Sequence, residues 1–252
     1  MITFEAFEAI YKAKRTKSKI WRTRYIKRYL ELKREGEMKI KKRQGNVEKM
    51  NKIVIYGGAL TGKTTLAGKI GKDKDDILVF STDGNAARQD FITADLAYTG
   101  TIETNKEIAS VLNSIVGRVH YVVFDLIEGI EDDIQRQFRA KNLASKAPAK
   151  LTYAQWDEVS AFYGGLYTVL MAFQEHFTYI FISRERDEYG KNKKGEEIIL
   201  GKVPALRDNP SKIIIPDVDL KIYASNWNGD VEYEIIGKRN VPESLIKLIE
   251  GE

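Results

Sequence analysis

The segment YGGALTGKTT, residues 56–65, constrains the fold of this chain more than any other feature of its sequence. It directly follows the apolar run IVI, and Gly57, Gly62, Lys63 and Thr64 match the pattern G-x-x-x-x-G-K-[ST]. Glycines allow backbone N–H groups to turn inward without a clash from a Cβ atom, so the loop can wrap phosphates. Because this pattern belongs between a strand and a helix, it predicts an α/β fold.

The same segment predicts the ligand. The ammonium group of Lys63 would reach the β- and γ-phosphates of a nucleoside triphosphate, and the hydroxyl of Thr64 would bind Mg²⁺. The N-terminus of the following helix favours bound phosphate. We therefore expect ATP and Mg²⁺ as cofactors. The expected nucleotide-binding residues are Gly57, Gly58, Ala59, Leu60, Thr61, Gly62, Lys63, Thr64 and Thr65.

Two carboxylates follow apolar runs that are typical of buried strands. Asp125 ends the run YVVFD and is the candidate for the aspartate on the Mg²⁺ side of the site. Leu126 follows it, which disfavours ATPases that place a water-activating glutamate directly after this aspartate. Asp83, in LVFSTDG, would face the γ-phosphate and polarise the attacking water. The alternatives are a cap or turn for Asp125 and a plain Asp-Gly turn for Asp83.

A fourth candidate lies where the apolar run YIFIS ends. Ser183 and Arg184 occupy this position, and in P-loop sheets a polar residue at the equivalent strand tip commonly senses the γ-phosphate. The alternative for Arg184 is an exposed charge in a loop. The catalytic residues expected from the sequence are thus Lys63, Asp83, Asp125 and Arg184.

From residue 52 onward, short apolar runs alternate with runs of helical periodicity. Strands are expected at KIVIYG, DILVFSTDG, HYVVFDLIEG and FTYIFIS, and helices at TTLAGKIG and KEIASVLNSI. A further helix should start at a capping box formed by Thr152 and Gln155. This alternation predicts a mainly parallel sheet with helices on both faces.

The C-terminal part differs. Two runs of alternating polarity flank Asn228-Gly229 and predict an antiparallel β-hairpin at one edge of the sheet, followed by a short helix in PESLIKLIEGE. Two polar segments, residues 139–150 and 184–202, are expected to be long exposed loops.

Charge divides the chain into two parts. Residues 1–50 carry 16 Lys and Arg against 6 Asp and Glu, which predicts a basic helical arm in front of an ATPase domain at residues 51–252. Trp21, Tyr25 and Tyr29 are interleaved with the basic residues, so the arm could follow a nucleic-acid backbone and stack on bases. The alternative is a helix that docks its aromatic stripe on the body or on a neighbouring subunit.

Composition excludes several classes of protein. There is no cysteine, and only two histidines occur, which argues against disulfides and against a zinc site. No apolar run approaches the ~20 residues that span a bilayer, so no membrane partner is expected. We expect a cytoplasmic protein.

The order of these motifs resembles the RecA-like ATPase core: YGGALTGKTT, then VFSTD, YVVFD, FISR and the C-terminal hairpin. The compact core, together with GKVPALRDNPSKIIIPDVD before the hairpin, looks more closely like the phage-encoded Sak-type single-strand annealing ATPases. The resemblance covers about residues 52–240. A phage-encoded protein would act in the host cytoplasm.

This resemblance implies a function and a set of residue roles. The implied activity is ATP-dependent binding and annealing of single-stranded DNA by a homo-oligomer, as a ring or filament; a single-strand-binding protein is a candidate partner. Lys63 and Thr64 match the phosphate and Mg²⁺ positions, and Asp125 matches the second Mg²⁺ position. Asp83 replaces the usual catalytic glutamate, and Arg184 replaces a glutamine sensor. The first of these departures suggests slow hydrolysis.

The resemblance also places DNA-binding loops at residues 139–150 and 184–202. The lysines expected to contact phosphates there are Lys141, Lys146, Lys150, Lys191, Lys193 and Lys194. Lys202 and Arg207 are candidates for completing the ATP site of a neighbouring subunit. For the lysines, the alternative is a solvated loop.

Two other functions share the phosphate-binding loop. A small-molecule kinase would carry an arginine-rich lid and an acceptor pocket, and no clear lid motif is present. A helicase-loader-type clamp would use ATP as a conformational switch, and the missing glutamate after Asp125 argues against the usual loaders.

Overall fold

The computed structural model describes residues 52–71, 73–84, 86, 89–192, 194–239 and 241–251. The basic arm of residues 1–50, including its aromatic stripe, therefore lies outside the described residues, as does Lys193.

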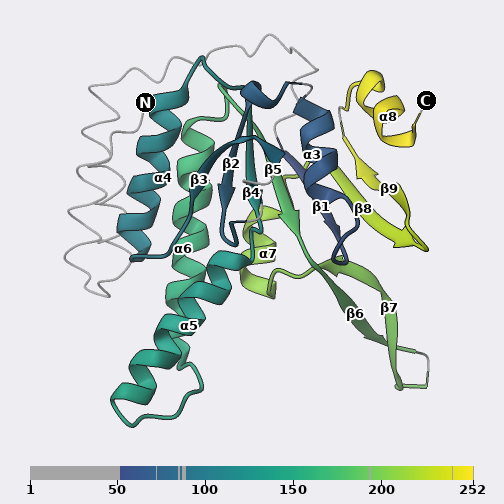
Figure 1. Ribbon diagram of the computed structural model, residues 1–252. Coiled ribbons are helices and arrows are strands. Elements are labelled where there is room, and N and C mark those ends of the chain that lie inside the picture. Colours follow the sequence, from purple (N-terminus) through teal and green to yellow (C-terminus); the bar gives the residue numbers. More distant parts are fainter. Residues whose placement is uncertain are drawn as a thin grey trace, which may run out of the picture. The chain divides into compact units, whose positions relative to one another are not determined.

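A seven-stranded sheet forms the centre of the fold, in the order β3-β2-β4-β5-β1-β8-β9 (Figure 1). Every neighbouring pair is parallel except β8 and β9, which are antiparallel. β5 lies between β1 and β4, so the strand that carries Asp125 is one strand removed from the phosphate-binding loop. The strands are β1 (Lys52–Gly57), β2 (Ile77–Ser81), β3 (Ile92–Asp95), β4 (Tyr121–Asp125), β5 (Thr178–Ser183), β8 (Leu220–Trp227) and β9 (Asp230–Lys238).

Helices cover both faces of this sheet. The α-helices are α3 (Lys63–Gly71), α4 (Thr101–Ile115), α5 (Gly129–Ala144), α6 (Tyr153–Ala172), α7 (Asp208–Ile214) and α8 (Glu243–Glu250), and a short 3-10 helix spans Lys74–Asp76. The sheet has a hydrophobic core on each face, because successive side chains of a strand point to opposite faces. In β1, Ile53 and Ile55 pack with α3 and α8, whereas Val54 and Tyr56 pack on the side of α4 and α6. The central strands are buried on both faces, as expected for a parallel sheet.

Two local predictions are confirmed at the level of hydrogen bonds. The backbone N–H of Gln155 donates to Thr152 Oγ1 at 3.3 Å, and the N–H of Thr152 donates to Gln155 Oε1 at 2.9 Å, which completes the capping box of α6. Asn228 and Gly229 both have positive φ values, 54° and 98°, as a two-residue hairpin turn between β8 and β9 requires.

The prediction of two long loops is wrong. α5 continues through residue 144, so only residues 145–152 form a loop there. Residues 184–202 largely form the separate two-stranded sheet of β6 (Glu185–Lys191) and β7 (Glu197–Pro204). Cross-strand charge pairs replace apolar alternation in this hairpin, as in the contact of Lys202 with Asp187 at 2.6 Å. β3 and α7 were also not expected from the sequence.

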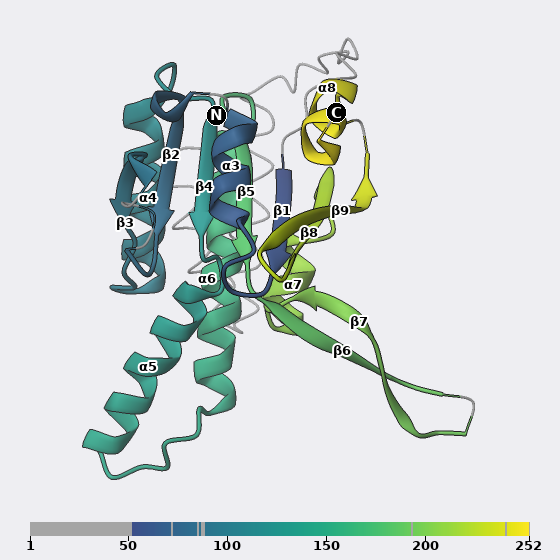
Figure 2. The ribbon, with the colours of Figure 1, turned by 45° about the vertical axis from the view of Figure 1, so that its right-hand side comes forward.

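α5 and the β6–β7 hairpin both extend from the edge of the sheet where the parallel strands end (Figures 1 and 2). The phosphate-binding loop lies at this same edge, since it joins the end of β1 to the start of α3. Within the part of the chain that the structure describes, no helix has both the length and the apolarity needed to cross a membrane.

Candidate functional site

The loop between β1 and α3 has three residues with positive φ, and two of them are glycines. Gly57, Leu60 and Gly62 have φ values of 157°, 59° and 71°. A Cβ atom on Gly57 would lie 2.0 Å from the carbonyl oxygen of Ala224 in β8, and one on Gly62 would lie 2.7 Å from the hydroxyl of Tyr233. Both positions therefore require glycine, for close packing as well as for φ.

The β8–β9 hairpin supports this loop through two side-chain hydrogen bonds. Asn226 Nδ2 donates a hydrogen bond to the carbonyl oxygen of Leu60 at 2.9 Å, and the hydroxyl of Tyr233 donates to the carbonyl oxygen of Gly62 at 3.2 Å. The sequence gives no local signal for these contacts, because the partners are separated by more than half of the chain. With two of its carbonyls held, the loop is fixed in a shape that leaves its N–H groups for phosphate.

Lys63 is 8% exposed and is folded into the loop. Its Nζ donates to the carbonyl oxygens of Gly57, at 3.0 Å, and of Gly58, and lies 3.4 Å from Thr61 Oγ1. Burial lowers the pKa of Lys63, and the neighbouring charge of Asp125 opposes that shift. A desolvated ammonium group held by carbonyls is well placed to exchange them for phosphate oxygens.

Thr64 and Asp125 meet at the mouth of the loop. Thr64 Oγ1 donates to Asp125 Oδ2 at 2.8 Å. Asp125 is 5% exposed, and burial raises its pKa to about 6; the hydrogen bond from Thr64 opposes the shift and the charge of Asp83 adds to it. A hydroxyl and a carboxylate are the hard oxygen ligands that Mg²⁺ takes when phosphates and water complete its shell. These two residues therefore fit the expected Mg²⁺ position.

No larger metal site is present among the residues that the structure describes: they contain no cluster of three or more His, Cys, Asp and Glu that could hold a metal.

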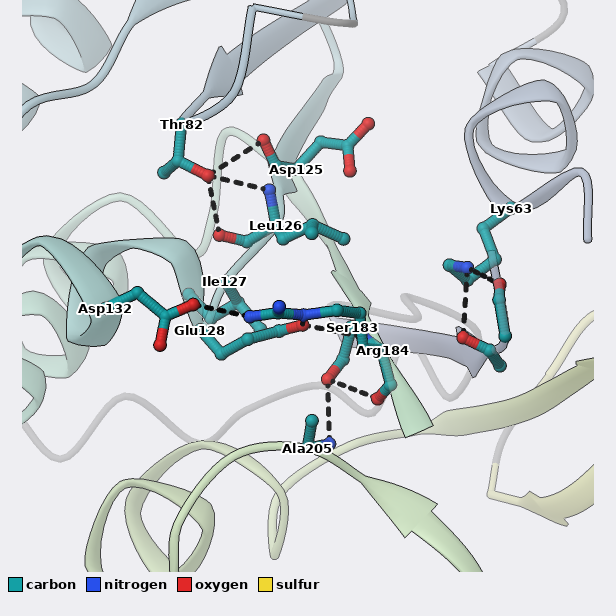
Figure 3. Close-up of polar contacts among 12 residues, drawn as sticks. Lys63, Thr82, Asp125, Leu126, Ile127, Glu128, Asp132, Ser183, Arg184 and Ala205 are labelled. Carbon is teal, nitrogen blue, oxygen red and sulfur yellow. Dashed lines mark hydrogen bonds and ion pairs between the residues drawn. The ribbon is translucent and has the colours of Figure 1, made fainter. Parts of the chain in front are cut away.

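Asp83 lies just beyond β2, exposed to solvent, and close enough to Asp125 that its charge raises the pKa of that residue. Ser81 Oγ donates to Asp83 Oδ1 at 3.4 Å. The adjacent Thr82 ties the end of β2 to the end of β4, because its Oγ1 accepts a hydrogen bond from the backbone N–H of Leu126 at 3.1 Å (Figure 3). The role of Asp83 as the base stays a prediction.

Arg184 forms ion pairs with two carboxylates, Glu128 at the N-cap of α5 and Asp132 in its first turn (Figure 3). Its backbone N–H and its Nε donate to Glu128 Oε1 at 2.7 and 3.0 Å, and its Nη2 donates to Asp132 Oδ2 at 2.5 Å. Burial alone would lower the pKa of Arg184, but these carboxylates outweigh it and raise the pKa. The proposed contact of Arg184 with a γ-phosphate stays a prediction, and it would compete with both ion pairs.

Glu128 is a residue of this site that the sequence reasoning missed. It is 3% exposed, three positions after Asp125, and its charge acts on both Lys63 and Asp125. An acidic residue at the start of a helix is normally explained by its favourable interaction with the helix dipole. The sequence alone therefore does not indicate that the carboxylate of Glu128 is buried.

The lysines expected to contact DNA lie on two separate projections. Lys141 is in the last turn of α5, and Lys146 and Lys150 are in the α5–α6 loop; all are exposed. Lys191 ends β6 and Lys194 is in the hairpin turn, also exposed. No described contact joins the two groups.

The two candidates for a role in a neighbouring subunit form contacts within this chain. Lys202 Nζ lies 3.6 Å from Glu185 and 2.6 Å from Asp187. Arg207 Nε lies 2.7 Å from Glu131, and its guanidinium lies 4.1 Å from the centroid of the Trp156 ring. A role in another subunit would require these contacts to be exchanged.

The fold and the site define a P-loop ATPase. The expected class, a RecA-like α/β fold with a mainly parallel sheet, helices on both faces and a C-terminal β-hairpin, is confirmed for the described residues. The family model described as "AAA domain" matches residues 49–244, and the chain belongs to that family.

Comparison with solved structures finds 36 matching chains, and one of these neighbours is distant in sequence. The crystal structure of the RadB recombinase has 14% sequence identity and a TM-score of 0.46, over 76% of this chain and 83% of that chain. The comparison with curated proteins finds no match.

Proposed function

We propose that this protein is a Mg²⁺-dependent ATPase that oligomerises, binds single-stranded DNA and promotes annealing or recombination, as the Sak-type resemblance implies. The observation that carries the ATPase part is the hydrogen bond between Thr64 and Asp125 at 2.8 Å, next to the buried ammonium group of Lys63. A phosphate-binding loop with both Mg²⁺-side groups in place has the parts needed for phosphoryl transfer.

The roles of the residues follow from their chemistry. Lys63 would exchange the carbonyls of Gly57 and Gly58 for phosphate oxygens, while the loop N–H groups bind the same phosphates. Thr64 and Asp125 would hold Mg²⁺, which neutralises charge on the phosphates. Binding of the cation favours the ionised form of Asp125, whose pKa burial raises to about 6. Asp83 is the candidate that the sequence offers for polarising the attacking water.

The DNA-binding part of the proposal rests on the two projections, α5 with its following loop and the β6–β7 hairpin. Each carries exposed lysines, and both extend from the sheet edge that holds the phosphate-binding loop. Lysines on extended elements can follow the backbone of a single strand, and each phosphate contact adds to the salt dependence of binding. This placement supports a coupling between DNA and the nucleotide, with the basic arm as a further contact.

The experiment is a steady-state ATPase assay with single-stranded DNA, with a nucleoside acceptor as control. Stimulation by single-stranded DNA is the expected result. Phosphate transfer to the nucleoside would instead indicate a small-molecule kinase. ATPase activity that needs a partner helicase would indicate a loader-type clamp.

A further inference from the structure

One oxygen of Glu128 has no partner. The side chain is 3% exposed, and Oε2 makes no hydrogen bond to any described residue. Buried polar atoms are nearly always hydrogen-bonded, and a charged one that is not is costly, so such an atom points to a ligand or water. Glu131 and Glu185 also have an unpartnered Oε2, but only the charge of Glu128 acts on both Lys63 and Asp125.

The other oxygen of Glu128 is held firmly. Oε1 accepts hydrogen bonds from the backbone N–H and from Nε of Arg184 (Figure 3). Two donors from one residue fix the position of the carboxylate, and Arg184 is itself anchored by Asp132. Because Oε1 is occupied, only Oε2 remains to accept a further hydrogen bond.

We propose that Glu128 is the catalytic residue that orients the attacking water, with Arg184 as its positioning residue. This rests on the proposed ATPase function. The water oxygen forms a bond to the γ-phosphorus, and the bond between that phosphorus and the bridging oxygen breaks. ADP leaves with the bridging oxygen. The proton of the water passes to Oε2 of Glu128, and inorganic phosphate is released.

The proposed step needs a carboxylate that both orients the water and takes its proton. The transition state of phosphoryl transfer is loose, so positioning the attacking water accounts for much of the catalysis. A carboxylate can therefore speed hydrolysis even when an arginine stabilises the negative charge of that carboxylate. Electrostatic contacts act more strongly in a water-excluded site, which favours buried Glu128 over Asp83, an exposed residue bonded to Ser81. Asp83 is the rival for this role.

The test compares three variants of the full chain: Glu128→Gln, Glu243→Gln and Asp83→Asn. Glutamine can still accept the hydrogen bonds of Arg184 but cannot take the proton. We expect Glu128→Gln to slow single-turnover hydrolysis about 100-fold or more, with Mg·ATP affinity within about threefold of the wild type. Glu243→Gln, at an exposed carboxylate of α8, is the matched control and should stay within about threefold of the wild-type rate.

Several outcomes would overturn the proposal. Wild-type turnover by Glu128→Gln would exclude it, and so would loss of turnover in Asp83→Asn alone. Equal losses in Glu128→Gln and Glu243→Gln would show that the loss of turnover does not come from Glu128 in particular. If the wild-type protein bound no Mg·ATP, the proposed function itself would fail, which is a separate result.

A further variant separates a catalytic from a structural role. If Glu128→Gln does not fold, Glu128→Asp keeps the charge and withdraws the oxygen by one methylene. This variant should bind Mg·ATP normally and hydrolyse it slowly, and full turnover would contradict the proposal.

Discussion

The ammonium group of Lys63 contacts carbonyls of the loop that it is expected to serve. We predict that Lys63→Ala abolishes Mg·ATP binding and turnover, because the phosphates lose their only charged partner within the loop. Isothermal calorimetry measures the binding. Lys69→Ala, at an exposed lysine of the same helix, is the matched control and should bind as the wild type does. Unchanged ATPase activity in Lys63→Ala would refute the phosphate-binding role.

A second residue-scale prediction concerns Glu131. Burial raises its pKa to about 7, against the opposing charge of Arg207. Since this folded-state pKa lies above the unfolded value of about 4.3, the carboxyl contributes stability fully below that value and loses it as the pH rises toward 7. Glu131→Gln imitates the protonated form. The variant should therefore gain up to about 3 kcal/mol relative to the wild type on going from about pH 4 to about pH 8.

Denaturant unfolding at these two pH values, without nucleotide, measures this difference. The control is Glu243→Gln, because Glu243 is 84% exposed and its one ion pair among the described residues is with Lys247, at 3.9 Å. A stability difference between Glu131→Gln and the wild type that is the same at both pH values would contradict the prediction.

At the scale of secondary-structure elements, the α5–α6 projection can be tested by its charges. We predict that replacing Lys141, Lys146 and Lys150 with alanine weakens single-stranded DNA binding. The slope of log affinity against log salt should become shallower by up to about 2, because each lost phosphate contact removes about 0.7 on a single strand. Fluorescence anisotropy over a salt series measures both quantities.

The matched control removes the same number of charges elsewhere. Lys69, Lys74 and Lys247 are exposed lysines of α3, the short 3-10 helix and α8. Their triple alanine variant should keep the wild-type slope. Equal effects of the two triple variants would show that net charge, and not the α5–α6 projection, sets the affinity.

Elements with a local chemical signal could be predicted from the sequence. The phosphate-binding loop, the strand that ends in Asp125, the capping box at Thr152 and the turn at Asn228 all have such signals, and all are present. The β6–β7 hairpin could not be predicted, because charge pairs between its strands replace the apolar alternation that identifies a strand.

The residues of the candidate site likewise fall into those that have a local sequence signal and those that have none. Lys63, Thr64 and Asp125 belong to a motif or to the end of an apolar run, and the structure brings them together. The burial of Glu128 and the two ion pairs of Arg184 depend on how α5 leaves the sheet, which no short pattern encodes. Contacts made between distant segments were the part that sequence reasoning missed.

At the scale of the whole molecule, charge is distributed unevenly. Residues 1–50 carry an excess of positive charge, while the rest of the chain is mildly acidic. We predict that deletion of residues 1–45 weakens single-stranded DNA binding and flattens its salt dependence, because the arm would supply phosphate contacts. Anisotropy over a salt series checks this. Unaltered affinity would instead assign the arm to assembly, which light scattering would detect.

The contacts that support the phosphate-binding loop come from the far end of the chain. Leu60 and Asn226 are 166 positions apart, and Gly62 and Tyr233 are 171 apart. A ribosome must therefore release at least 166 residues beyond Leu60 before the loop acquires its supports. Nucleotide binding would therefore follow the synthesis of β8 and β9. A chain terminated before these strands would carry the full G-x-x-x-x-G-K-T motif without the hairpin that supports it.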